Sequence, residues 1–222
     1  MGGTGGGTGS GTGRLVTGVA WALLLLGMWL WGKEVTGGPG RPSGPTTGDV
    51  AAVGRPLAVP LPPARDPLRE ARPRRLRVPS LGITAPVVPR GLDATGAIEP
   101  PPYEMPQTVG WFGSGAAPGT DGAALLVGHV DTDTKPAVFY GLSSARPGAR
   151  IEVTRADGSV AEFTVEDVRV FTRREFDARR AYGQHVPGRA ELRLITCGGT
   201  FDRATGSYTA NVVVSAYLTG LR

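Results

Sequence analysis

The run Leu192-Arg193-Leu194-Ile195-Thr196-Cys197 is apolar and strand-like, and it ends in the only cysteine of the chain. Gly198 and Gly199 follow at once. We expect the two glycines to end the strand and to let other backbone approach the sulfur atom. The thiol is therefore predicted to be accessible, although a buried and inert cysteine is the alternative that this residue alone leaves open.

An upstream apolar run predicts a second strand with a chemical group at its end. Ala123-Ala124-Leu125-Leu126-Val127 leads directly into Gly128-His129-Val130-Asp131. A structural role is the default interpretation of a single histidine. A thiol and an imidazole at two strand ends instead form a nucleophile and a base, the pairing that activates cysteine enzymes. The pattern therefore predicts Cys197 as the nucleophile and His129 as its base.

The other polar residues near these runs do not indicate a metal site. His185, the only other histidine, lies in a turn-rich loop, and we expect it to be solvated. A single cysteine can form neither an internal disulfide nor a cysteine-based zinc cluster. Asp131 and Asp133 could suggest calcium, but two carboxylates without a ligand-spaced loop are more typical of a strand end at the surface. We expect no metal and no cofactor.

The first third of the chain is rich in glycine and proline and predicts segments outside the core. Residues 1–14 form a low-complexity Gly/Thr tail. Residues 15–32 carry no charge and are long enough to span a bilayer, with Trp29 and Trp31 placed as an interfacial belt. A cleaved signal peptide is the alternative, but no small-x-small cleavage site follows Trp31. We therefore expect an uncleaved transmembrane anchor.

Residues 33–73 form a Pro/Gly/Arg-rich linker, which proline makes semi-extended. Residues 33–79 hold nine basic and four acidic residues, a net charge of +5, whereas residues 80–222 carry −1. This stalk could lie against anionic headgroups or wall polymers, or it could be merely a soluble linker. Its arginines flank a predicted anchor and lack aromatic or helical spacing, so we expect no nucleic-acid partner.

From Leu76 onward, short β-type runs alternate with turn signals. Asp157-Gly158 is the clearest hairpin signal, because this pair suits a tight turn between two alternating runs. Residues 173–182 predict one short helix. Many short strands with glycine turns predict a closed β-barrel or a sandwich. The predicted strands are 76–78, 83–88, 123–127, 150–154, 162–170, 192–196 and 212–217.

The motifs around the thiol and the imidazole resemble those of sortases, the membrane-anchored cysteine transpeptidases of Gram-positive bacteria. The resemblance covers roughly residues 74–222 and includes Val109-Gly110-Trp111-Phe112, Pro118-Gly119 and the closing run 211–216. The stretch from Cys197 to Asp202, with Gly206-Ser207-Tyr208, is most similar to the class F sortases of actinobacteria.

This resemblance implies an eight-stranded sortase β-barrel, a catalytic domain over residues 74–222. In the family, a cysteine cleaves an LPXTG-like sorting signal between Thr and Gly, and an amine resolves the thioester acyl-enzyme. Cys197 takes the place of the nucleophile and His129 that of the general acid and base. The implied partners are secreted proteins with such C-terminal signals and an amine such as a peptidoglycan precursor. The implied location is the cell membrane, with a single span and an extracellular catalytic domain.

The third family residue is an arginine on the last strand, which holds the substrate and the developing oxyanion. Here Asn211 stands at that position when the Thr205-Gly206 turn is aligned with the equivalent turn of sortase A. The nearest arginine is Arg203, six residues after Cys197, and we predict that it reaches the site. The side-chain amide of Asn211 is the alternative donor. The residues that bind the sorting signal are not readable from residues 171–190.

Two other functions fit parts of this pattern. An L,D-transpeptidase is also an exported cysteine enzyme, but the Ser-His-Gly-Cys block of that class is absent before Cys197. A membrane-tethered, non-catalytic β-barrel that binds a ligand is the alternative from a different class, and the displaced arginine favours it. Fast alkylation of the thiol would indicate the enzyme.

Overall fold

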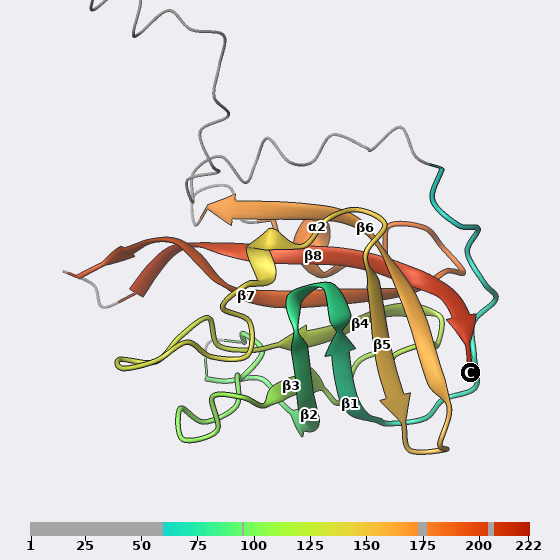
Figure 1. Ribbon diagram of the computed structural model, residues 1–222, viewed down its shortest axis with the longest axis horizontal. Coiled ribbons are helices and arrows are strands. Elements are labelled where there is room, and N and C mark those ends of the chain that lie inside the picture. Colours follow the sequence, from blue (N-terminus) through green and yellow to red (C-terminus); the bar gives the residue numbers. More distant parts are fainter. Residues whose placement is uncertain (1–59, 95, 173–176, 204–206) are drawn as a thin grey trace, which may run out of the picture. The chain divides into compact units, whose positions relative to one another are not determined.

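The computed structural model describes residues 60–222, except for 95, 173–176 and 204–206 (Figure 1). The predicted tail, the anchor and most of the linker lie outside the described residues. Within the described part of the chain, no helix is long and apolar enough to cross a membrane.

Eight strands close into a barrel in the order β1-β2-β3-β4-β7-β8-β6-β5. This confirms the predicted mainly-β class and its closed, eight-stranded form. The short helices among the described residues are η2 (Pro79–Leu81), η3 (Leu142–Ser144) and α2 (Ala178–Tyr182). The strands are β1 (Pro73–Val78), β2 (Ile83–Arg90), β3 (Val109–Phe112), β4 (Gly122–Val127), β5 (Arg150–Arg155), β6 (Val160–Thr172), β7 (Ala190–Asp202) and β8 (Ser207–Leu221).

The interior of the barrel holds the main apolar core, because alternate side chains of each strand point inward. Leu126 on β4, Leu194 on β7 and Val214 on β8 are fully buried in this cluster, together with Phe163 on β6. Burial of each such side chain contributes about 1.5–3 kcal/mol to folding. The core therefore fixes the register of the strands that carry the candidate catalytic residues.

Strand β3 was not among the strands predicted from periodicity. It has only four residues, and glycine at its second position disfavours a strand in isolation. The neighbouring strands explain the glycine. β3 pairs with β2 on one side and with β4 on the other, and Gly110 belongs to both ladders. A Cβ atom on Gly110 would lie 2.7 Å from Cγ of Arg90, so close packing requires the glycine.

The predicted Asp157-Gly158 hairpin is confirmed. β5 and β6 pair in antiparallel fashion around this turn. The Arg155 amide donates to the carbonyl of Ser159 over 2.8 Å, and the Gly158 amide donates to the carbonyl of Arg155 over 3.1 Å. The predicted helix over 173–182 is shorter in the described residues: α2 begins after Asp177, whose carboxylate caps it, and residues 173–176 lie outside the described part.

The expectation that Gly198 and Gly199 end their strand is wrong. β7 continues to Asp202, and its pairing with β8 shifts register between Gly198 and Phe201. Gly199 adopts φ +78°, and a Cβ atom there would lie 2.6 Å from Oγ1 of Thr209. The two glycines therefore form a bulge that re-aims the hairpin beyond the cysteine. In Figure 1 the β7–β8 hairpin projects from the rest of the barrel.

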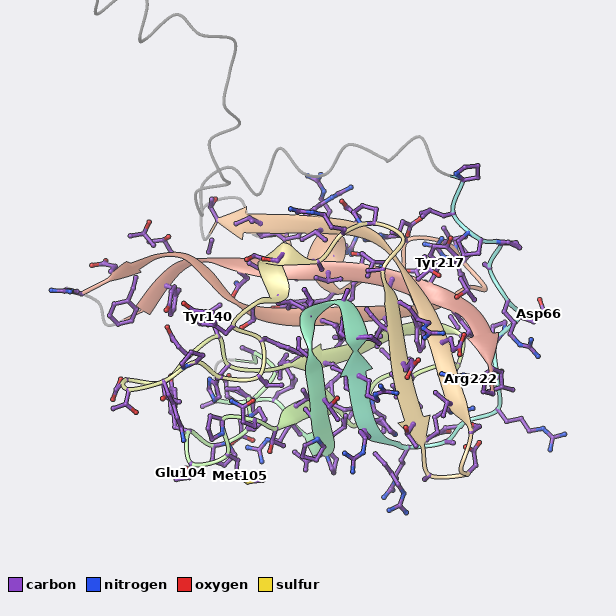
Figure 2. The ribbon with its side chains drawn as sticks, in the orientation of Figure 1. Asp66, Glu104, Met105, Tyr140, Tyr217 and Arg222 are labelled. Atoms are coloured by element: carbon purple, nitrogen blue, oxygen red, sulfur yellow. The ribbon has the colours of Figure 1, made fainter. Side chains whose placement is uncertain are left out.

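The described end of the predicted linker lies against the barrel. The amide of Arg65 donates to the carbonyl of Leu218, and the amide of Leu68 donates to the carbonyl of Gly119, over 2.9 and 2.7 Å. The Tyr217 hydroxyl donates to the carbonyl of Pro62 over 2.6 Å; Figure 2 labels Tyr217 on this side of the molecule. Residues 62–68 thus pack as part of the folded unit.

Candidate active site

The parallel pairing of β4 with β7 brings His129 and Cys197 to the same edge of the barrel. Val127 and Ile195 are register partners, and the amide of Gly128 continues the ladder by donating to the carbonyl of Ile195 over 3.1 Å. His129 and Cys197 each lie two residues beyond that pair. The two residues therefore lie at equivalent positions on neighbouring segments of the sheet, where adjacent strands are about 4.8 Å apart.

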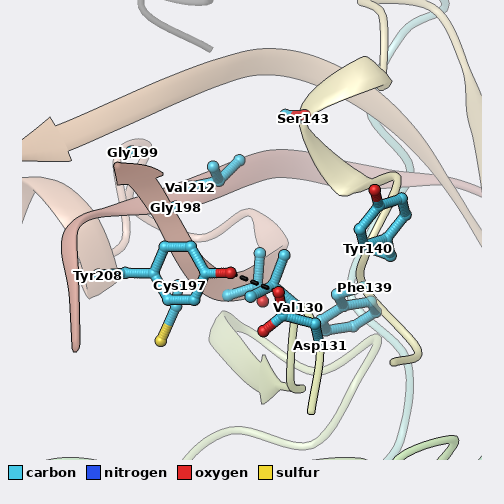
Figure 3. Close-up of a pocket in the computed structure, with 11 residues that line it drawn as sticks. Val130, Asp131, Phe139, Tyr140, Ser143, Cys197, Gly198, Gly199, Tyr208 and Val212 are labelled. Carbon is cyan, nitrogen blue, oxygen red and sulfur yellow. Dashed lines mark hydrogen bonds between the residues drawn. The ribbon is translucent and has the colours of Figure 1, made fainter. Parts of the chain in front are cut away.

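Cys197 is exposed and lines a pocket of about 280 Å³ (Figure 3). The prediction of an accessible thiol is therefore confirmed. The same pocket is lined by Tyr140 and Ser143 from the connection between β4 and β5, and by Thr196 from β7. A thiol in such a pocket can meet a substrate carbonyl without rearrangement of the core.

The imidazole of His129 is held by the loop between β2 and β3. His129 is only 8% exposed, and its Nε2 donates to the carbonyl of Pro101 over 2.6 Å. The ring of Tyr103 stacks on the imidazole, with centroids 4.3 Å apart and an interplanar angle of 20°. Glu104 and Met105 mark the outer edge of the same loop in Figure 2. The loop therefore fixes the imidazole plane and places a proton on Nε2.

Pro101 and Tyr103 were missed by the sequence analysis. They lie in the proline-rich stretch Glu99-Pro100-Pro101-Pro102-Tyr103, which has no periodicity and no charged motif. A lone aromatic residue among prolines was the available signal, but the sequence does not tell which residue it contacts.

Asn211 is the register partner of Cys197 across the β7–β8 ladder. Side chains of directly opposed residues lie on the same face of a sheet, so the amide of Asn211 is a neighbour of the thiol. Arg203 is exposed in the turn that follows β7, beyond the pair of Asp202 and Ser207. Six residues of extended chain span about 20 Å, more than an arginine side chain covers. The predicted role of Arg203 is untested, and the register favours Asn211.

A second contact ties the two sides of the pocket together. The hydroxyl of Tyr208, on β8, donates a hydrogen bond to Oδ2 of Asp131, which follows β4 (Figure 3). Burial, the hydrogen bond to Asp131 and the charge of Asp131 together raise the pKa of Tyr208 to about 12. Asp131, predicted from the sequence as a surface residue at a strand end, therefore has a specific partner in Tyr208, which no local pattern indicates.

The connection between β6 and β7 packs on a small apolar cluster that includes Ile195, two residues before Cys197. Ala181 of α2 packs in a small cluster with Val127, Ile195 and Val213, and Tyr182 lies against it. Burial raises the pKa of Tyr182, and the charge of Cys197 adds to the rise. His185 is exposed in the following loop, as predicted.

Two comparisons with known proteins agree with the closed barrel fold. The family model of the sortase domain matches residues 76–219. Among solved structures, the chain is similar to a pilus-related sortase C of Group B Streptococcus, with 16% identity, a TM-score of 0.50 and coverage of 69% of each chain. It is also similar to sortase A of Listeria monocytogenes, with 19% identity, a TM-score of 0.50 and coverage of 69% of this chain and 90% of that one. No curated protein matches the chain.

Proposed function

Because the chain belongs to the sortase family, we propose that it is a cysteine transpeptidase that cleaves an LPXTG-like sorting signal between Thr and Gly. The observation that carries this proposal is the register of β4 and β7, which puts an exposed thiol and a held imidazole two residues beyond one paired position. Class F character, as in actinobacteria, is part of the same proposal and rests on the Cys197–Asp202 motif.

In the first half-reaction, the Cys197 thiolate attacks the threonine carbonyl of the signal. The C–S bond forms, and the oxyanion needs a donor, for which the register supports the side-chain amide of Asn211. The C–N bond then breaks, and His129 gives its proton to the leaving glycine amine. A thioester on Cys197 is the product.

In the second half-reaction, an amine of the cell wall attacks the thioester. His129 takes a proton from the amine, the C–N bond forms, and the electron pair of the broken C–S bond returns to the sulfur of Cys197. The partly exposed side chain of Tyr182, which packs against the cluster of Ile195, is a suitable surface for the Leu-Pro part of the signal.

The proposed setting is the cell membrane, with a single span at residues 15–32 and the catalytic domain outside. The proposed partners are secreted proteins with C-terminal sorting signals and an amine acceptor such as a peptidoglycan precursor. Protease treatment of intact cells tests this arrangement: an external domain is digested, and a domain on the cytoplasmic side is protected.

The activity is tested with the full-length chain and a fluorescence-quenched LPXTG peptide, with and without triglycine. We expect cleavage without any added cofactor, and mass spectrometry should detect the triglycine adduct. Cys197→Ala is the matched control and should be inactive, because the truncation removes the nucleophile alone. A folded chain that cleaves no variant of the signal would instead favour the alternative of a tethered, non-catalytic binding barrel.

A further inference from the structure

We propose that Asp131 recruits the acceptor amine as an ammonium ion to the pocket beside Cys197. This inference rests on the proposed function and names the side chain that recognises the second substrate. Asp131 and Cys197 line the same pocket, and Asp131 lies two residues after His129.

The charge of Asp131 is not neutralised within the described part of the chain. None of the ion pairs between described residues includes this carboxylate. Its side chain accepts a hydrogen bond from the hydroxyl of Tyr208, a neutral donor (Figure 3). A carboxylate that keeps its charge in a pocket raises the local concentration of cations.

The first half-reaction does not explain a carboxylate at this position. A negative charge near a thiol disfavours the thiolate, which is the reactive form. Asp131 and Cys197 line the same pocket, so the charge of the carboxylate acts in the surroundings of the thiol. In the acyl-enzyme the sulfur carries no charge, and the incoming substrate is a primary amine that is mostly protonated at neutral pH. The carboxylate is therefore suited to the second half-reaction.

Thr196 gives independent support for a ligand in this pocket. The residue is only 4% exposed and lines the pocket, and its Oγ1 has no hydrogen-bond partner among the described residues. A buried hydroxyl without a partner costs free energy, which a bound donor recovers. An ammonium group has three N–H donors, so an ammonium that binds the Asp131 carboxylate keeps donors for a second acceptor of the pocket lining.

The bound ammonium releases one proton to water and becomes the nucleophilic amine. The amine nitrogen attacks the thioester carbonyl, the C–N bond forms and the C–S bond breaks. The second proton goes to His129, and the electron pair remains on the sulfur of Cys197. Asp131 thus acts before the bond-forming step, by holding the amine close to the thioester.

Binding is measured first, without turnover. Triglycine is titrated by calorimetry into the full-length Cys197→Ala chain, beside N-acetyl-triglycine, which has no amine. We expect triglycine to bind more tightly than the acetylated peptide. Asp131→Asn should weaken the binding of triglycine about tenfold, the effect of losing one charge-assisted hydrogen bond. Asp133→Asn is the matched control, because Asp133 is exposed and does not line the pocket. Equal binding of both peptides, or equal binding by both Asn variants, would overturn the proposal.

Turnover then separates an amine site from a structural role. The acyl-enzyme of the wild type and of Asp131→Asn is resolved by triglycine, by Nα-acetyl-lysine amide or by hydroxylamine, which is largely uncharged at neutral pH. We expect the rate ratio of triglycine to hydroxylamine to fall about tenfold in the variant, and the lysine arm shows whether side-chain amines use the same site. A uniform fall with all three nucleophiles would contradict the proposal. Triglycine binding that depends on Asp131 in a chain without cleavage would refute the proposed function and leave the amine site standing.

Discussion

The imidazole of His129 is positioned by residues far from it in the sequence. The carbonyl of Pro101 accepts a hydrogen bond from its Nε2, and Tyr103 covers one face of the ring. The hydrogen bond restricts rotation of the ring, and the stacked phenol excludes water from that face. These contacts determine whether the acid and base of the proposed mechanism is aligned before substrate arrives.

Tyr103→Ala should lower kcat/KM for the quenched LPXTG peptide by about threefold to tenfold, because a stacked aromatic pair contributes about 0.5–1.5 kcal/mol. Tyr103→Phe keeps the ring and should retain the wild-type value. The pH profile of kcat/KM is measured for all three proteins. An unchanged rate and profile in the Ala variant would show that the stacking does not position His129.

Two variants identify the side chain that donates a hydrogen bond to the oxyanion. Asn211→Ala should lower kcat by about 100-fold to 1,000-fold, the cost of one preorganised oxyanion donor, because Asn211 is the register partner of Cys197. Arg203→Ala should stay near the wild-type kcat, since Arg203 lies in the turn beyond the end of β7. The reverse result would assign the role to Arg203, as the sequence predicts.

At the scale of elements, a buried ionic cluster holds the connection between β6 and β7 on the barrel. Glu191 and Arg193 on β7 are completely buried and form an ion pair. Glu191 also accepts the backbone amides of His185 and Val186 over 2.9 and 3.0 Å, and Arg193 donates to the carbonyl of Gly183 over 2.8 Å. The cluster thereby anchors the loop that follows α2, the helix beside Cys197.

Glu191→Gln should lower the free energy of unfolding at neutral pH by about 3 kcal/mol, because it leaves Arg193 as a buried charge without its partner. Glu99→Gln is the matched control. It removes a surface ion pair with Arg90 and should cost less than about 1 kcal/mol. Urea denaturation of the three proteins measures the difference, and equal stabilities would contradict the role of the cluster.

The same cluster predicts a dependence of stability on pH. Burial by itself raises the pKa of Glu191, but the His185 amide and the Arg193 charge outweigh it, so the pKa in the folded state is below the ordinary value. The ionised carboxylate therefore stabilises the fold above the unfolded pKa of about 4.3, and this contribution is lost as pH falls through the folded pKa. The stability gap between wild type and Glu191→Gln should shrink below about pH 4. A gap that stays constant down to acid pH would refute this.

Local patterns predicted most of these elements and little of their contacts. Alternation of apolar residues identified the β-runs at 123–127 and 192–196, because burial of one face imposes a period of two. β3 was missed because its glycine is required by a neighbouring strand, which local propensity does not contain. The predicted nucleophile and base lie within recognisable sequence motifs, whereas Tyr103 and Tyr208 reach the site only through tertiary folding.

At the scale of the whole molecule, the folded unit includes chain that composition assigned to the linker. Leu68 packs against the main core, and its Cδ1 would lie 2.9 Å from a Cβ atom on Gly119. The backbone of Arg69 and that of Arg72 bond to Arg155 and Ala156 at the β5–β6 turn. Proline-rich composition lowered the expectation of order here, although the extended chain that proline favours can still pair with a barrel.

Leu68→Ala in the full-length chain should lower the free energy of unfolding by about 2 kcal/mol, through loss of buried apolar contact. Leu92→Ala is the matched control, because Leu92 is 54% exposed and should change stability by less than about 0.5 kcal/mol. Urea denaturation followed by tryptophan fluorescence measures both variants. Equal effects would mean that the segment around Leu68 does not stabilise the barrel.

The central claim, covalent catalysis at Cys197, is tested most directly by the mass of the intact protein during turnover. The full-length chain is mixed with an LPXTG peptide in the absence of an amine, quenched in acid and weighed by mass spectrometry. We predict a rise equal to the peptide fragment that ends in Thr, a digest that locates it on Cys197, and its release by hydroxylamine. Peptide cleavage without any adduct, or an adduct that persists in Cys197→Ala, would contradict the claim.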